Sequence, residues 1–206
     1  MNRRNALAAA LLGAAALVAS PSLLALGDGA AVGKPAPAFE LKDQSGKTVK
    51  LADFAGKTVV LEWFNPDCPF VVGTYEKGPA KATVDELKKE GAVFLAINST
   101  GNAPLEEVTK KSTAFLEKNK IAHPVLFDHD GATGKAYGAK TTPHVFVIDG
   151  KGVLRYEGAF SADSSFADKN AKNFVLDAVK AIKAGGEVKP DHEKPWGCSV
   201  KYKASN

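Results

Sequence analysis

Two cysteines occur in the 206 residues, and one of them lies where thiol chemistry is favoured. Cys68 follows a near-continuous apolar run, Val59 to Phe64, and precedes Pro69, a residue suited to the first turn of a helix. The free N–H groups at a helix start and the positive end of its macrodipole stabilise an anion, so they lower the pKa of a thiol placed there. Since the thiolate is the nucleophilic form, the sequence predicts a reactive cysteine at position 68.

Asp67 has two opposed effects on this thiol. Its carboxylate is a favourable N-cap, which supports a helix beginning beside Cys68. The same negative charge disfavours a second anion next to it. We therefore expect the pKa of Cys68 to be lowered only moderately.

The second cysteine, Cys198, lies far downstream in a polar segment punctuated by Pro190 and Pro195. A tail of this kind could bring it to Cys68 as a resolving thiol, provided that the two Cα atoms approach within about 7 Å. Two alternatives stay open. The pair could form a permanent staple, as in many exported proteins, or Cys198 could be a thiol with no catalytic part.

The four histidines give no metal-binding pattern. His123, His129, His144 and His192 are not in close ligand spacing, and two distant cysteines do not make a zinc motif, so we expect no metal and no cofactor. His144 follows Pro143 and could lie near the thiol, where an imidazolium would favour the thiolate. A lone histidine at such a place more often simply ends a strand.

The elements that must position Cys68 alternate along the chain. Turn residues at 44–47 and 149–152 separate apolar segments and predict two hairpins, and the apolar run before Cys68 is typical of a central strand covered on both faces. We predict strands at 39–41, 49–51, 59–64, 93–97, 125–127, 145–148 and 153–156, and helices after Cys68 as far as 90 with a break at 78–79, at 105–119, at 131–137 and at 174–182. This order predicts an α/β fold with a mixed central β-sheet sandwiched by helices.

The N-terminus predicts export. Arg3-Arg4 is followed by an uncharged apolar run, Ala6 to Val18, which is typical of a signal peptide, here residues 1–27. Ser20-Pro21-Ser22 interrupts the run before it reaches the roughly 20 residues of a membrane anchor. The arginine pair also fits a twin-arginine signal, although an ordinary positive flank is the simpler interpretation. We predict a periplasmic or secreted protein.

Length and charge limit the remaining organisation. A chain of this size, 45% hydrophobic, accommodates one ordinary core, which we assign to residues 33–184, with a C-terminal tail over 185–206 that carries Cys198. The net charge is only +4 and lysines alternate with acids, so no basic stripe for nucleic acid is expected. Trp63 and Trp196 are expected to be packing residues.

The order strand, cysteine, proline and helix resembles the active-site turn of the thioredoxin-like superfamily, over roughly 35–182. Thr141-Thr142-Pro143, followed by an apolar strand, looks like its peroxiredoxin and redoxin branch, the alkyl hydroperoxide reductase/thiol-specific antioxidant-like proteins. A closer resemblance is to a peroxiredoxin-like subgroup marked by Cys-Pro-Phe-Val, here Cys68 to Val71, and by a terminal Gly-Cys-Ser-(Ile or Val)-Lys, here Gly197 to Lys201.

The resemblance implies a thioredoxin-like fold with an N-terminal β-hairpin and a C-terminal tail. It also implies that Pro143 follows a cis peptide bond and faces the cysteine turn, while Thr142 pairs with the backbone of an incoming substrate. Cys68 and Cys198 are then the expected catalytic residues, and Thr142 and Pro143 the expected substrate-binding residues.

Two departures from the family pattern restrict the chemistry. Val71 stands where the usual turn has its second cysteine, so the turn holds no dithiol of its own. The peroxidase signature has a threonine or serine three residues before the cysteine and a proline further upstream. This chain has Asn65 and Leu61 at those positions. The arginine directed at peroxide has no match, since Arg155 falls on a hairpin strand. A peroxide substrate is therefore less favoured than a disulfide.

These observations lead to three hypotheses. The first is an exported thiol-disulfide oxidoreductase or thiol-dependent antioxidant protein, in which Cys68 attacks a disulfide sulfur or a peroxide oxygen and Cys198 closes the bridge. Its expected partners are thiol or disulfide proteins, small molecules or a peroxide, and a thioredoxin-like reductant, with neither nucleic acid nor a stable membrane anchor. The alternatives are a peroxiredoxin-like thiol peroxidase and a non-enzymatic envelope binding or chaperone module that uses the cleft by Pro143.

Overall fold

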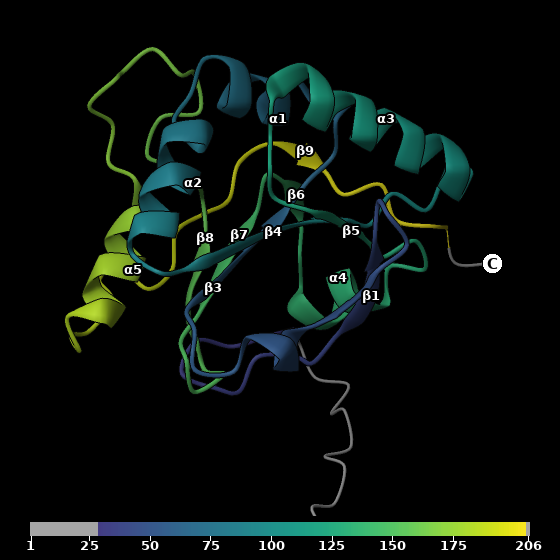
Figure 1. Ribbon diagram of the computed structural model, residues 1–206. Coiled ribbons are helices and arrows are strands. Elements are labelled where there is room, and N and C mark those ends of the chain that lie inside the picture. The colour runs from purple at the N-terminus through teal and green to yellow at the C-terminus, as the bar shows by residue number, and fades with distance from the viewer. Residues whose placement is uncertain (1–28, 205–206) are drawn as a thin grey trace, which may run out of the picture.

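Seven strands form one mixed sheet, and helices cover both of its faces (Figure 1). The computed structural model describes residues 29–204, so the predicted signal peptide lies outside the described residues. The strands are β1 (Glu40–Asp43), β2 (Thr48–Lys50), β3 (Val59–Trp63), β4 (Val93–Asn98), β5 (Val125–Phe127), β6 (Thr141–Thr142), β7 (Val145–Ile148), β8 (Leu154–Gly158) and β9 (Cys198–Ser199). The helices are η1 (Leu51–Phe54), α1 (Pro69–Glu76), α2 (Ala80–Lys89), α3 (Leu105–Asn119), α4 (Ala132–Tyr137) and α5 (Phe174–Lys183). The predicted mixed sheet between helices is confirmed.

The strand before Cys68 lies inside the sheet, as predicted. The strand order is β2-β1-β5-β4-β3-β7-β8, and β3 is parallel to β4 and antiparallel to β7. All residues of β3 are buried, because both faces of the sheet are covered at this strand. The segment that carries Cys68 therefore begins from a rigid position in the protein.

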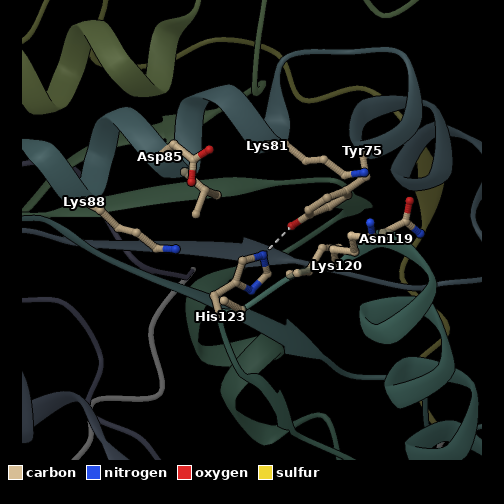
Figure 2. A pocket seen from close by; sticks show the side chains of 10 residues that line it. Tyr75, Lys81, Asp85, Lys88, Asn119, Lys120 and His123 are labelled. Carbon is tan, nitrogen blue, oxygen red and sulfur yellow. Dashed lines mark hydrogen bonds between the residues drawn. The ribbon is translucent and has the colours of Figure 1, made fainter.

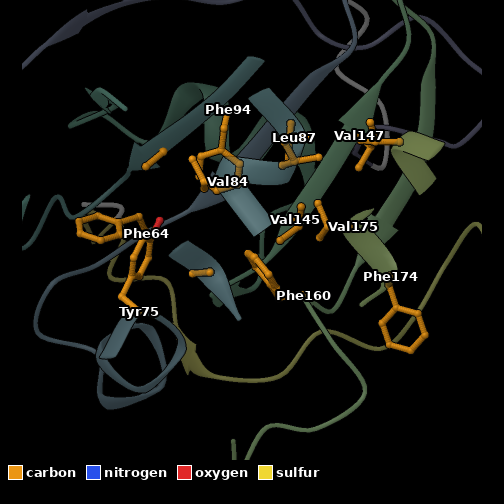
Figure 3. Packing of buried hydrophobic residues seen from close by; sticks show 14 of the residues in the cluster. Phe64, Tyr75, Val84, Leu87, Phe94, Val145, Val147, Phe160, Phe174 and Val175 are labelled. Carbon is orange, nitrogen blue, oxygen red and sulfur yellow. The ribbon is translucent and has the colours of Figure 1, made fainter. Parts of the chain in front are cut away.

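The side chains of β3 alternate between two hydrophobic cores. Val59, Leu61 and Trp63 pack on the face covered by α4 and the N-terminal segment. Val60 and, just past the strand, Phe64 pack on the opposite face, against residues of α1, α2, α3 and α5. Figure 3 shows this second core, in which aromatic and branched aliphatic side chains from helices and sheet pack together.

Other local predictions are also confirmed. The turns at 44–47 and 149–152 join β1 to β2 and β7 to β8 as antiparallel hairpins. The helical stretch after Cys68 is divided at Gly78-Pro79 into α1 and α2. None of the helices described between residues 29 and 204 is long and apolar enough to cross a bilayer.

After α5 the chain returns across the molecule as an extended tail, yellow in Figure 1. Backbone hydrogen bonds attach it at intervals, from Glu157 N–H to Asp191 C=O (3.1 Å) and from Gly101 N–H to Lys201 C=O (2.8 Å). In between, β9 pairs antiparallel with β6. Because β6 leads into β7, the antiparallel neighbour of β3, this pairing brings Cys198 to the end of the sheet where β3 stops.

Candidate active site

A turn built on Asn65 sets the position of Cys68. The Asn65 side-chain oxygen accepts a hydrogen bond from the N–H of Asp67 (2.8 Å), and its carbonyl accepts one from the N–H of Cys68 (3.1 Å). Cys68 is then the N-cap residue of α1, and Pro69 occupies the first helical position, where its missing N–H leaves no partner unsatisfied. The predicted thiol at a helix start is confirmed.

The prediction that Asp67 caps this helix is wrong. The turn at Asn65 makes Cys68 the N-cap, one residue beyond Asp67, and the Asp67 carboxylate pairs with the Lys111 ammonium of α3 (3.0 Å). Its side chain is 62% exposed. Its charge is therefore screened by solvent and by Lys111, and it opposes a thiolate at Cys68 less than the sequence suggests.

The four residues predicted to form the site lie together. The Cys68 thiol is buried and donates a hydrogen bond to the Thr142 carbonyl oxygen (3.0 Å). The peptide bond between Thr142 and Pro143 is cis, as predicted. Thr142 of β6 pairs with Cys198 of β9, and this pairing places the Cys198 sulfur 2.8 Å from the Cys68 sulfur. A disulfide requires about 2.05 Å, so the two thiols are unbonded but need to move by less than about 1 Å to bond.

The two thiols differ in acidity. Burial raises the pKa of Cys68, but hydrogen bonds from the side chains of Cys198 and Thr142 and from the N–H of Val71 stabilise its thiolate and bring the pKa below its usual value. Burial, the hydrogen bond with Cys68 and the negative charge of Cys68 raise the pKa of Cys198 to about 11. Cys68 therefore loses its proton first, and Cys198 keeps its own.

His144 supplies no positive charge to this pair. Its ring is buried against Phe146, with centroids 4.4 Å apart, and its Nδ1 accepts a hydrogen bond from the N–H of Lys140 (3.2 Å). Burial and the nearby charge of Lys140 lower the pKa of His144 to about 3, so the ring is neutral at physiological pH. The residue lies in the short connection between β6 and β7, just before β7 begins, so it does not end a strand as the simpler interpretation expected.

A second polar cluster was not predicted. Glu62 of β3 is fully buried, and its Oε2 accepts a hydrogen bond from the Tyr75 hydroxyl (2.6 Å), while its Oε1 has no partner. The same hydroxyl lies 3.1 Å from His123 Nε2. Burial raises the pKa of Glu62 to about 8 and lowers that of His123 to about 4. One signal was present in the sequence, since Glu62 is the charged residue within an apolar strand.

Tyr75 and His123 line a cavity of about 340 Å³ between α2 and the end of α3. Figure 2 shows the two side chains pointing toward each other, with Lys81, Lys88 and Lys120 around them. Among residues 29–204, no group of three or more histidine, cysteine, aspartate or glutamate side chains is placed to hold a metal ion.

The comparisons with known proteins agree with this geometry. Residues 32–157 match the AhpC/TSA family. The thiol:disulfide interchange protein DsbE of Yersinia pestis is 30% identical over 138 residues, 64% of this chain and 66% of the relative. The chloroplastic peroxiredoxin Q of Triticum aestivum is 31% identical over 157 residues, 68% of this chain and 67% of the relative. The chain thus spans about two thirds of the length of these curated relatives.

A solved structure extends the similarity to most of the chain. The hypothetical protein SMc02350 of Sinorhizobium meliloti superposes with a TM-score of 0.75 at 28% identity, covering 85% of this chain and 96% of that one. The predictions of a thioredoxin-like fold and of a thiol-dependent oxidoreductase from the redoxin branch are therefore confirmed at the level of the family. A match over more than half of its residues shows that the chain belongs to the AhpC/TSA family.

Proposed function

We propose that the protein is an exported thiol-disulfide oxidoreductase in which Cys68 is the nucleophile and Cys198 the resolving thiol. One observation carries the proposal: two unbonded sulfurs lie 2.8 Å apart at the start of a helix, one with a lowered pKa and the other with a raised one. A pair arranged in this way has an attacking thiolate and a thiol that waits for the second step.

The first step is attack by the Cys68 thiolate on a sulfur of the substrate disulfide. A Cys68–substrate disulfide forms, the substrate S–S bond breaks, and one substrate sulfur leaves as a thiolate that takes up a proton. The charge on Cys68 disappears in this step, and that charge is one cause of the raised pKa of Cys198. Loss of the Cys198 proton therefore becomes easier once the mixed disulfide exists.

The second step is attack by the Cys198 thiolate on the Cys68 sulfur. A Cys68–Cys198 bond forms and the second substrate sulfur leaves as a thiolate, so the substrate is reduced by two electrons and the protein is oxidised by two. An external dithiol, such as that of a thioredoxin-like protein, then reduces the Cys68–Cys198 bond. The reaction cycle requires only the two thiols, the substrate disulfide and the external dithiol.

Export is the part of the proposal that depends on the N-terminal sequence. A basic flank and a short apolar run precede the domain, as in a signal peptide. Disulfides such as Cys68–Cys198 form and persist in oxidising compartments outside the cytoplasm. Fractionation of cells that produce the full chain, with sequencing of the mature N-terminus, tests this part. Recovery of the uncleaved chain in the cytoplasm would contradict it.

Single-cysteine variants test the chemistry. In reduction of a protein disulfide by a dithiol, Cys68→Ser should abolish turnover, whereas Cys198→Ser should allow one attack and accumulate the Cys68–substrate mixed disulfide. Turnover by Cys68→Ser at the native rate would refute the proposal. Binding of an unfolded client by the variant lacking both cysteines would instead favour the chaperone alternative.

Thiol peroxidase activity is the second candidate, and the similarity to peroxiredoxin Q favours it. Against it, Asn65 and Leu61 replace the expected signature residues, and the guanidinium of Arg155 pairs with Asp149 at the β7–β8 turn (3.1 Å). The measurement that separates the two is the rate at which hydrogen peroxide oxidises Cys68. A rate equal to that of a free thiol excludes a peroxidase, and a rate far above it establishes one.

A further inference from the structure

The tail crosses the thiol site as an added strand. Thr141 pairs with Ser199 and Thr142 with Cys198, and the N–H of Val200 donates to the carbonyl of Lys140 (3.1 Å). An extended peptide belonging to the chain itself thus lies along β6, with its cysteine beside Cys68. Backbone pairing of this kind supplies affinity without regard to side chains, so selectivity must come from the neighbouring positions.

The position before the tail cysteine admits only glycine. Gly197 has φ 130°, and a Cβ built there would overlap the carbonyl oxygen of Thr142. The backbone at this position lies directly against the Thr142–Pro143 turn. Any side chain would push the following cysteine away from Cys68.

The position two residues before the cysteine fills an aromatic slot. The Trp196 ring packs against Phe70 of α1 and Phe166 of the loop that precedes α5, with ring centroids 6.1 Å and 5.8 Å away. Its indole N–H donates to the carbonyl of Ser161 (2.8 Å). The slot thus offers two aromatic neighbours, one tilted by 44° and one in an edge-to-face arrangement at 71°, together with one hydrogen-bond acceptor, which are contacts that suit a large aromatic side chain.

Phe166, which forms one wall of the slot, is held in place by its surroundings. Phe166 lies against Gly73 and Gly78 of the α1–α2 region, where a Cβ at either glycine would overlap its ring. Its backbone φ is 62°, a conformation rarely adopted by a bulky residue. The side chain of Asp163 accepts hydrogen bonds from the N–H groups of Ala167 and Asp168 and so holds the loop in this form.

We propose that the tail is a pseudosubstrate and that the strand position beside β6 accepts an extended client polypeptide with an aromatic residue two positions before its cysteine and glycine between them. This inference rests on the proposed function, because the client cysteine must take the place of Cys198 beside Cys68. Client and tail compete for one strand position, so return of the tail releases the reduced client.

The test uses the full chain carrying Trp196→Ala and Cys198→Ser, in which the slot is open and the tail has no thiol. The probes are three peptides, Lys-Pro-Trp-Gly-Cys-Ser-Val-Lys and its versions with alanine for tryptophan or for glycine, each with its cysteine joined to thionitrobenzoate. Attack by the Cys68 thiolate forms a Cys68–peptide disulfide and releases coloured thionitrobenzoate, so atoms and electrons balance and the rate is read directly.

The tryptophan peptide should react about ten times faster than either alanine version, which corresponds to roughly 1.4 kcal/mol. Phe166→Ala, added to the same chain, should abolish the preference for tryptophan. Phe54→Ala is the matched control, since Phe54 is also a half-buried phenylalanine but lies in η1 and lines a different cavity. It should preserve the preference.

Equal rates for the three peptides would overturn the inference. The three rates are compared on the same protein, the Trp196→Ala and Cys198→Ser chain. A folding failure of Phe166→Ala therefore does not affect this comparison. A small aromatic disulfide with no peptide distinguishes failure of the pseudosubstrate proposal from failure of the thiol chemistry itself. If Cys68 reacts with it rapidly but discriminates among no peptides, only the pseudosubstrate inference fails. If Cys68 reacts with neither, the proposed function fails as well.

Discussion

The hydroxyl of Tyr75 donates a 2.6 Å hydrogen bond to the buried carboxyl of Glu62, which has no other partner. Burial favours the protonated form of this carboxyl in the folded protein and raises its pKa to about 8, against the opposing effect of the Tyr75 hydrogen bond. The unfolded chain has no such preference. Burial of Glu62 therefore links protein stability to pH.

The first prediction follows from the sign of that shift. Between about pH 4.5 and pH 8 the folded state binds a proton at Glu62 that the unfolded state has lost, so the free energy of unfolding should fall as pH rises through this window. Glu62→Gln is neutral at every pH and should be more stable than the native chain at pH 8, by at least about 1 kcal/mol. Urea denaturation of both proteins across the window measures the difference. Parallel stability curves for the two would contradict the prediction.

The second prediction concerns the acidity of Cys68. The Cys198 thiol is the leading cause that lowers the pKa of Cys68, so Cys198→Ala should raise that pKa toward its ordinary value. Cys198→Ser should raise it less, because a serine hydroxyl can still donate to the thiolate. The pH dependence of iodoacetamide alkylation reports the pKa in each variant. Identical profiles for the alanine variant and the native chain would show that Cys198 contributes nothing.

The third prediction separates two reasons why position 197 requires glycine, namely the close contact with the Thr142 carbonyl and the positive φ of the backbone. Gly197→Ala should detach the tail near β9, because the new methyl group overlaps the Thr142 carbonyl, and the alkylation rate of the Cys68 thiolate, measured at a pH where Cys68 is fully ionised, should rise about ten-fold or more. Gly152→Ala provides the control, since Gly152 also has positive φ (78°) but a Cβ placed there would have no atom within 4 Å. It should leave that rate unchanged. A similar rise in both variants would implicate backbone strain alone.

The fourth prediction concerns Asp67. Its carboxylate is exposed and paired with Lys111, so Asp67→Asn should leave the pKa of Cys68 within about 0.3 of the native value. Alkylation at several salt concentrations measures this directly. A Cys68 pKa much lower in the variant than in the native chain at low salt, with the difference vanishing at high salt, would restore the sequence-based view that Asp67 opposes the thiolate.

The position of Cys68 could be predicted from the sequence because its causes are local. An apolar strand, a turn residue and a proline at the first helical position lie within about ten residues of one another, and their preferences agree. The cis bond before Pro143 was predicted from family resemblance. The N-cap was assigned to Asp67 in place of Cys68 because Asn65 and Asp67 are both suitable turn formers, and only the fold selects between them.

The contact with Cys198 could be suggested by the sequence, but no sequence pattern establishes it. It depends on β9 pairing with β6, two strands of two residues each, and so short a pattern has no periodicity to detect. The slot for Trp196 depends on Phe166, whose left-handed backbone is set by the surrounding loop. The hydrogen bond between Glu62 and Tyr75 joins a strand to a helix, which no local pattern specifies.

A bond between Cys68 and Cys198 would fasten β9 to β6 covalently. If the tail is a pseudosubstrate, the oxidised molecule could not bind a client, because β9 would stay paired with β6. Only the dithiol form would exchange β9 for a client strand. The oxidised molecule would accept a client again only after a dithiol had reduced the Cys68–Cys198 bond, and Cys198 is the more accessible of the two sulfurs for that attack.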